Sequence, residues 1–251
     1  MKIKNKLLST FVAASLAISA GSAMAAEKIR FATEGAWALF NFIDETGKPQ
    51  GFDVDIADAL CEKLQAECEM VTQDWDGLIP GLKVRKFDAI IASMSITEER
   101  QRVVDFTDPY YSGGLRFVAA KDKDFDTTVE ALKGKTIGAQ RATVGGIYLE
   151  DNLSDVVNVK LYDTNDSVYL DLKSGRLDGA ISDELPTYEW LKNEPGFEYK
   201  GEAFNKNDKI GIAVRKNDQE LRDKLNRALQ AIVADGTYAE INAKYFPFSI
   251  Y

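Results

Sequence analysis

Apolar and polar positions alternate along the first half of this chain in the order strand, helix, strand, helix, strand. Lys28 to Glu34 predicts a short first strand, and Phe52 to Leu64 predicts a helix with apolar residues on one face. Cys68 to Thr72 then predicts a strand and Leu78 to Val84 a helix. That helix leads into the nearly continuous apolar run from Phe87 to Met94, which is typical of a buried parallel strand. This order predicts an α/β structure with a mainly parallel sheet flanked by helices.

The same alternation begins again after the turn-rich break from Asp108 to Gly114. We expect the second half to repeat the architecture of the first. The pattern predicts strands at 116–120, 135–139, 157–162 and 178–182, and helices at 127–132, from about 143, and at 165–173.

The C-terminal part predicts one more strand and two helices. Lys209 to Val214 is the strand, and Asn217 with Glu220 forms a capping box for a long helix whose apolar stripe ends before Gly236. Tyr238 to Lys244 predicts the last helix. We expect the long helix to pack on the first lobe, so the chain would cross between lobes twice and form a two-stranded hinge. The expected lobes are 26–112 with 212–251, and 113–211.

An internal repeat supports two similar lobes. Residues 82–93 (LKVRKFDAIIAS) match residues 172–183 (LKSGRLDGAISD) at a constant offset of 90 without a gap. The match makes Ser93 and Asp183 equivalent, each at the carboxyl end of a central strand, where open α/β sheets bind ligands. Chance similarity between two helix-to-strand junctions is the alternative explanation.

The stretch after Phe87 predicts an anion site. Ser95 could cap a short helix with Glu98 three residues on, which would leave backbone N–H groups free near Ser93 and Ser95. Arg100 lies one turn into this helix, and its planar guanidinium could pair with a carboxylate held there. An ordinary capped helix with a surface arginine would show the same spacing.

Composition limits the class of protein. Residues 1–25 have the basic start, apolar core and Ala23-Met24-Ala25 box of a secretory signal peptide. The residue directly after this box is not a cysteine, so we expect no lipid anchor at the cleavage point. Removal of the signal peptide would take the formal net charge from −9 to −12, which disfavours nucleic acid and anionic membranes as partners. We expect a soluble, exported, periplasmic protein.

The chemistry-bearing residues exclude several classes of enzyme. The chain has no histidine, so the usual zinc sites and the Ser-His and Cys-His catalytic arrangements are absent. We expect no catalytic residues, no metal and no cofactor. The two cysteines, Cys61 and Cys68, favour a disulfide in an exported protein, and two buried thiols are the alternative.

Long motifs in a fixed order resemble the solute-binding proteins of bacterial polar amino-acid ABC importers, in particular the lysine/arginine/ornithine, arginine and octopine/nopaline branch. The resemblance covers essentially the whole mature chain. The motifs are IRFATEG (29–35), GFDVDIADALC (51–61), QDWDGLIPGL (73–82), FDAIIASMSITEER (87–100), FTDPYY (106–111), RLDGAISD (176–183) and DGTYAEINAKYF (235–246). The resemblance implies a two-lobed type II periplasmic binding-protein fold and a ligand enclosed between the lobes.

The resemblance also implies how the two charged ends of an amino acid would be held. The α-carboxylate would meet Arg100, the Ser95 region and N–H groups near Thr143 and Val144. Ala92 and Met94, in the same segment, are also expected to line the ligand site. The α-amino group would meet Ser93 and Asp183. Ala142 stands where a glycine is frequent in this family, which puts the geometry of the loop in doubt, and Ala92 replaces a serine that is usual in the histidine-binding type.

The ligand side chain would meet a second set of residues. Glu34 matches an acidic position of this branch, and Trp37 and Trp75 match its aromatic positions. Gln140 matches the arginine and opine types. A carboxylate beside two indoles suits a guanidinium or ammonium group. A core tryptophan at 75 and a solvated charge at 34 are the plain alternatives.

These residues predict capture of a cationic L-amino acid, or an arginine derivative such as an opine, for a membrane permease. We expect a monomer that meets the permease transiently and binds no nucleic acid. Cyclohexadienyl and arogenate dehydratases resemble the same binding proteins, so an enzyme on this scaffold is one alternative. A sensor that presents its closed form to a receptor is another.

Overall fold

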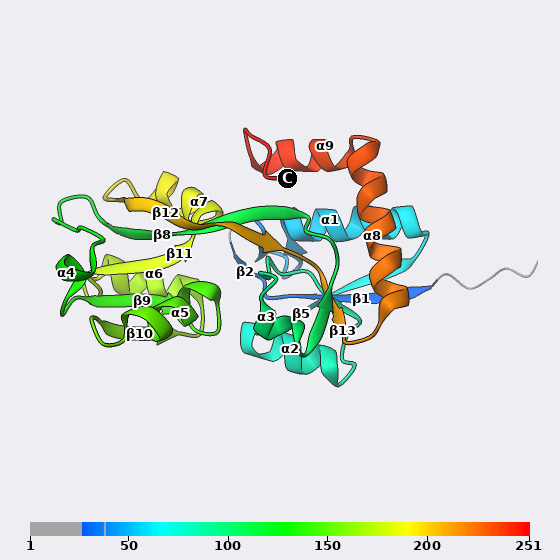
Figure 1. Ribbon diagram of the computed structural model, residues 1–251. Coiled ribbons are helices and arrows are strands. Elements are labelled where there is room, and N and C mark those ends of the chain that lie inside the picture. Colours follow the sequence, from blue (N-terminus) through cyan, green and yellow to red (C-terminus); the bar gives the residue numbers. More distant parts are fainter. Residues whose placement is uncertain (1–26, 38) are drawn as a thin grey trace, which may run out of the picture.

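The computed structural model describes residues 27–37 and 39–251, so the expected signal peptide lies outside the described residues. These residues form two α/β lobes, each built on a five-stranded sheet (Figure 1). The first sheet has the strand order β5-β1-β6-β13-β7. Its strands are β1 (Lys28–Thr33), β5 (Glu67–Thr72), β6 (Ala89–Ile90), β7 (Val104–Phe106) and β13 (Ala213–Arg215).

Helices cover both faces of the first sheet. One apolar cluster joins Ile56 and Leu60 to Leu225 and Leu229, and a second cluster contains Leu78 on the opposite face. The expected packing of the long C-terminal helix on this lobe is therefore confirmed. The helices are α1 (Phe52–Leu64), α2 (Trp75–Lys83), α3 (Glu98–Gln101), α8 (Gln219–Ala234) and α9 (Thr237–Tyr245).

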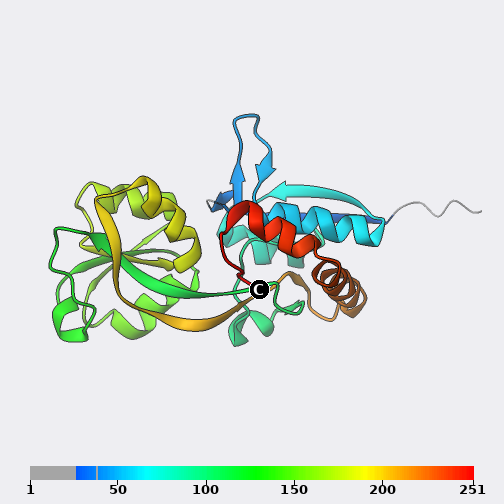
Figure 2. The same cartoon turned by 90° about the horizontal axis from the view of Figure 1, so that it is seen from above.

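A small three-stranded sheet projects from the first lobe (Figure 2). It consists of β2 (Ala36–Trp37), β3 (Asn41–Ile43) and β4 (Pro49–Gln50). The sequence did not predict these strands, because two or three residues are too few to show a period-2 pattern. The sheet holds Trp37 at the edge of the space between the lobes.

The second sheet has the order β10-β9-β11-β8-β12. Its strands are β8 (Tyr111–Ala120), β9 (Thr136–Gln140), β10 (Asn158–Tyr162), β11 (Gly179–Asp183) and β12 (Phe197–Ile210). The helices of this lobe are α4 (Val129–Leu132), α5 (Val144–Tyr148) with the π-helical turn η1 (Leu149–Leu153), α6 (Asn165–Lys173) and α7 (Glu184–Asn193).

The two sheets have the same plan, as the internal repeat predicts. β6 and β11 are both central, and each has a parallel neighbour, β1 for β6 and β9 for β11. The equivalent carboxylates Asp88 and Asp178 accept backbone N–H groups from Arg30 and Thr136 at 3.1 and 2.8 Å. The repeat is therefore structural and places Ser93 and Asp183 after equivalent strands.

Two long strands connect the lobes. β8 and β12 pair antiparallel, with Ile210 opposite Tyr111 and Lys209 opposite Ser112, and both run from one lobe to the other (Figures 1 and 2). They carry the two predicted crossings. Only the last two residues of β12 fall in a predicted strand, because its mostly polar positions, few of them buried, show no clear alternation.

The two-lobed α/β fold is confirmed, with corrections to its details. Each sheet is mixed by one strand: β13 runs antiparallel to its neighbours β6 and β7 in the first sheet, and β8 runs antiparallel to its neighbours β11 and β12 in the second. The run from Phe87 to Met94 holds only the two-residue strand β6. The expected cap residues are also wrong. Thr97 caps α3 and Asp218 caps α8, in place of Ser95 and Asn217.

Candidate functional site

The segment after β6 places Ser93 beyond the carboxyl end of the central strand of the first sheet. Ser93 has φ +52°, a left-handed conformation that is uncommon for a residue with a side chain. Its hydroxyl donates to Asp53 Oδ2 at 2.9 Å, and Asp53 also accepts from Tyr110 Oη at 2.6 Å and Asn41 Nδ2 at 2.8 Å. Burial raises the pKa of Asp53 to about 6, against these three donors. Asp53 therefore anchors Ser93 from behind.

Ala92 and Met94 face the other way. Both side chains are buried, at 1% exposure each, in the apolar cluster beneath α2. Met94 contributes its carbonyl to Gly211 N at 3.1 Å. These two predicted site residues therefore support the segment from the core, and Ser93 and Ser95 carry its polar groups.

Ser95 is held by the connecting strand β12. Ile96 N donates to Lys209 O at 2.7 Å, and Ser95 pairs with Ile210 in an antiparallel bridge. With Met94 and Ile96 bonded to the strand, the backbone of Ser95 points away from it. The Ser95 hydroxyl donates to Asp208 Oδ2 at 2.6 Å. This contact replaces the helix cap that the spacing predicted.

Arg100 lies where both lobes meet. Its guanidinium donates to Ser95 O at 2.8 Å and across the cleft to Ala142 O at 3.0 Å, and it lies 5.3 Å from the Trp75 ring. The residue is only 7% exposed, which rules out a surface arginine. Burial lowers the pKa of Arg100, and Asp208 and Asp183 oppose that shift.

Asp183 is a charged residue of the second lobe that interacts electrostatically with Arg100. It ends β11 and precedes α7. Burial, and after it the charge of Asp208, raise the pKa of Asp183 to about 7, against the lowering effect of Arg100. The three charged groups therefore share one site, and Asp208 is a member that the sequence did not predict.

The loop after β9 closes on the first lobe. Ala142 has φ +54°, a conformation that glycine adopts at lower cost. Thr143 caps α5, and its hydroxyl accepts from Gly146 N at 3.1 Å and donates to Gln140 O at 2.7 Å. The hydroxyl is thus used within the loop. Val144 begins the helix, so the N–H groups at its start are the donors that this loop can offer.

A second polar group lies at the other end of the space between the lobes. Gln140 Nε2 donates to Glu34 Oε1 at 2.6 Å and to Asp163 O at 3.0 Å. In the described part of the chain, buried side-chain atoms without a hydrogen-bond partner include Glu34 Oε2, Gln140 Oε1 and Trp37 Nε1. With one oxygen buried and the other bonded to Gln140, Glu34 is not a solvated strand-end charge. Burial raises the pKa of Glu34 to about 7, against the lowering effects of Gln140 and Trp37.

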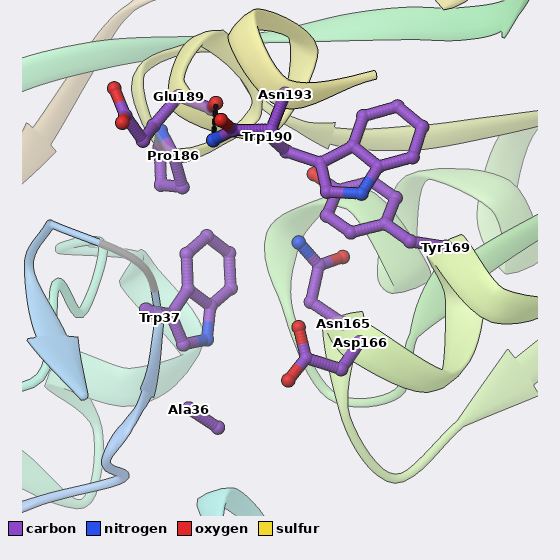
Figure 3. A pocket seen from close by; sticks show the side chains of 9 residues that line it. All are labelled: Ala36, Trp37, Asn165, Asp166, Tyr169, Pro186, Glu189, Trp190 and Asn193. Atoms are coloured by element: carbon purple, nitrogen blue, oxygen red, sulfur yellow. Dashed lines mark hydrogen bonds between the residues drawn. The ribbon is translucent and has the colours of Figure 1, made fainter. Parts of the chain in front are cut away.

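Two cavities flank this group. The larger, of roughly 710 Å³, lies between the lobes and is lined by Glu34, Trp75, Arg141 and Asp163 among others. A smaller one of roughly 150 Å³ lies between Trp37 and helices α6 and α7 (Figure 3). Trp75 is 8% exposed and packs in the core cluster of α2, yet it also lines the larger cavity. It therefore serves as core residue and cleft wall together.

Three consecutive residues of the second lobe contact the first lobe. The three contacts are a side-chain hydrogen bond, an ion pair and a hydrogen bond to a backbone carbonyl. Through them, one loop of the second lobe contacts both polar groups of the site. The contacts join Gln140 to Glu34, Arg141 to Asp76 at 3.3 Å, and the Ala142 carbonyl to Arg100.

Other features bear on the class of protein. Cys61 and Cys68 form a disulfide. Within the described ranges, no group of three or more His, Cys, Asp or Glu residues is arranged to hold a metal ion. None of the helices described there has the length and hydropathy needed to cross a membrane.

Two lobes that hold polar groups from both sides of a cleft define a ligand-binding protein, and comparison with known proteins identifies its family. Residues 29–248 match the bacterial extracellular solute-binding proteins, family 3, and the chain belongs to that family. A putative ABC transporter arginine-binding protein 2 from Escherichia coli K12 is 41% identical over 239 residues, covering 94% of this chain and 97% of that protein.

Two further relatives give the range of the likeness. The histidine-binding periplasmic protein of the same strain is 39% identical over 243 residues, covering 93% of this chain and 94% of that protein. The solved structure of an ancestral arginine-binding protein bound to arginine is 40% identical, with a TM-score of 0.83, covering 87% of this chain and 98% of that one. These relatives are binding proteins, as the sequence predicts for this chain, and they give the dehydratase alternative no support.

Proposed function

We propose that this protein captures a cationic L-amino acid, with arginine the best fit, and delivers it to an ABC importer permease when the lobes close. The observation that carries the proposal is a pair of buried acceptors without a hydrogen-bond partner. They are Oε2 of the Glu34 carboxylate and Oε1 of Gln140, whose amide nitrogen donates to that carboxylate. A guanidinium has five N–H donors in a planar fork and no acceptor, so it can satisfy both atoms. The names of the arginine-binding relatives agree with this chemistry.

The α-carboxylate and α-ammonium groups would lie at the opposite end of the cleft. Arg100 and the N–H groups at the start of α5, near Thr143 and Val144, would hold the carboxylate. Ser93 and Asp183 would take the ammonium. Trp37 and Trp75 would offer ring faces to the cation, a contact worth ~0.5–2 kcal/mol. The indole N–H of Trp37 is a donor on the side of Glu34, whose pKa it lowers, and does not serve a cation.

The remaining assignments follow from this role. The first lobe would comprise 26–112 with 212–251 and the second 113–211, hinged where β8 and β12 connect them. Residues 1–25 would direct export to the periplasm, where the mature protein would act as a monomer. A receptor-coupled sensor would bind the same ligand, and pull-down of the cognate permease by the liganded protein separates the two roles.

A thermal-shift panel tests the proposed ligand class. Protein refolded to remove carried-over ligand is heated with arginine, ornithine, lysine, histidine, octopine, nopaline, glutamine or glutamate. A ligand that binds only the folded state raises the midpoint by mass action, so we expect the largest shift with arginine or another cationic compound. A shift with glutamate or glutamine and none with any cationic compound would refute the proposal.

A further inference from the structure

Two buried carboxylates lie directly behind the serine hydroxyls of the site. Asp53, on the first turn of α1, accepts the Ser93 hydroxyl at 2.9 Å. Asp208, on the connecting strand β12, accepts the Ser95 hydroxyl at 2.6 Å. Asp53 is fully buried and Asp208 is 7% exposed, and the two acids come from different parts of the fold. The same arrangement therefore occurs twice in one short segment.

These contacts decide which way each hydroxyl points. An ionised carboxylate only accepts hydrogen bonds, and a serine hydroxyl has one proton to give. The protons of Ser93 and Ser95 are therefore directed at Asp53 and Asp208. What remains available on each serine oxygen is its lone pairs. Tyr110 and Asn41 also donate to Asp53, so donors surround that acid and favour its ionised, accepting form.

The backbone holds both serines in this orientation. Ser93 has φ +52°, and Ser95 is fixed by its bridge to Ile210 on β12. Asp183 belongs to the same group of charges, since Asp208 and Arg100 both act on its carboxyl. The two serine oxygens and the Asp183 carboxylate are the acceptors of this site, a set that we call the acceptor wall, and the Arg100 guanidinium donates to Ser95 O beside it at 2.8 Å.

We propose that Asp53 and Asp208 are positioning residues that hold the Ser93 and Ser95 hydroxyls as acceptors, so that this wall selects the ligand ammonium group. The inference rests on the proposed function and assigns to Ser95 a role different from carboxylate binding. An ammonium has three N–H donors, whereas a carboxylate presented to the same wall would meet only lone pairs. The ligand carboxylate is left to Arg100 and to backbone N–H groups.

Calorimetric titration of Asp208 variants tests this assignment with two ligands. L-Arginine carries the α-ammonium group, and 5-guanidinopentanoate is the same molecule without it. Asp208→Ala frees the Ser95 hydroxyl to rotate, and we expect it to weaken arginine binding at least tenfold. Its affinity for 5-guanidinopentanoate should stay within threefold of wild type. Asp208→Asn keeps an acceptor oxygen and should restore part of the lost arginine affinity.

Matched variants separate positioning from a direct or structural effect. With Ser95→Ala already in place, adding Asp208→Ala should change arginine affinity less than threefold, because the hydroxyl it positions is gone. Asn207→Ala, at an exposed neighbour on the same strand, should have no effect. Urea unfolding checks that each variant is folded. Ser93→Ala should likewise weaken binding of arginine and leave that of 5-guanidinopentanoate unchanged.

Three results would overturn the inference. An equal loss for both ligands would mean that Asp208 acts only on the structure of the site. A full tenfold effect of Asp208→Ala in the Ser95→Ala background would mean that Asp208 contacts the ligand directly. Failure of the wild type to bind arginine or any other cationic amino acid would refute the proposed function, and this inference with it, whereas arginine binding with either of the first two results overturns the inference alone.

Discussion

Replacing Glu34 by glutamine should strengthen the unliganded protein and weaken ligand binding. One oxygen of Glu34 is buried without a partner, and burial raises its pKa from 4.5 to about 7. That difference corresponds to an ionisation cost of about 3 kcal/mol in the folded state. Between about pH 4.5 and 7 the folded state binds more protons than the unfolded state, so Glu34 lowers stability as the pH rises through this window. Above pH 7 the penalty is fully present.

Glu34→Gln removes the charge and keeps the shape. We expect the free energy of unfolding of the unliganded variant to exceed that of wild type by about 1–3 kcal/mol at pH 8 and to match it at pH 4. Arginine affinity should fall about 10- to 100-fold, because a hydrogen bond to a charged group contributes about 1.5–3 kcal/mol. Citrulline, the neutral isostere of arginine, should bind no worse than to wild type.

The assay combines urea unfolding at the two pH values with calorimetric titration of both ligands. Glu45→Gln, at an exposed acid between β3 and β4, is the matched control and should change neither stability nor affinity. A variant at position 34 that is less stable than wild type at pH 8 and binds arginine normally would refute the reasoning. Glu34 would then be a structural hydrogen-bonding residue.

Three other perturbations have defined outcomes. Arg100→Ala should weaken arginine binding at least 100-fold in calorimetry with the urea transition still cooperative, while the exposed neighbour in Arg102→Ala should not matter; affinity within threefold of wild type would contradict the assigned role. Arginine affinity should fall at least tenfold from pH 8 to 5.5, because Asp183 and Glu34, with pKa values of about 7, take up protons and lose their charge. An affinity that does not change with pH would mean that neither carboxylate binds the ligand. Reducing the Cys61–Cys68 disulfide should lower the free energy of unfolding by roughly 2–3 kcal/mol, as expected for a loop this short, and an unchanged urea midpoint would contradict that.

Much of the fold could be predicted because its signals are local and strong. The stripe of α1 predicts its bounds, Phe52–Leu64, to the residue. The repeat at an offset of 90 captured a shared structural unit, down to the equivalent roles of Asp88 and Asp178. β12 gave no such signal, because most of its residues are polar, few are buried, and it is stabilised by pairing with β8, far away in the sequence.

The site could be predicted only where its residues follow recognisable strands. Ser93 and Asp183 follow equivalent strands, as the repeat implies, and Arg100 contacts the second lobe through Ala142 O. Asp208 could not be predicted, because its hydrogen bond with Ser95 joins residues 113 positions apart and no sequence pattern predicts such a pair. The same contact explains why Ser95 is not the predicted helix cap: its hydroxyl is already committed to β12.

The central claim is that opposite ends of one cationic amino acid are held at Arg100 and at Glu34. Binding of arginine and two analogues, each lacking one of the charges, tests this claim most directly. Agmatine lacks the α-carboxylate of arginine, and citrulline lacks its positive charge. Calorimetric titration of the refolded wild type should show tight binding of L-arginine and at least tenfold weaker binding of each analogue. Equal affinity for arginine and citrulline would contradict the cation site at Glu34, and equal affinity for arginine and agmatine would contradict the carboxylate site at Arg100.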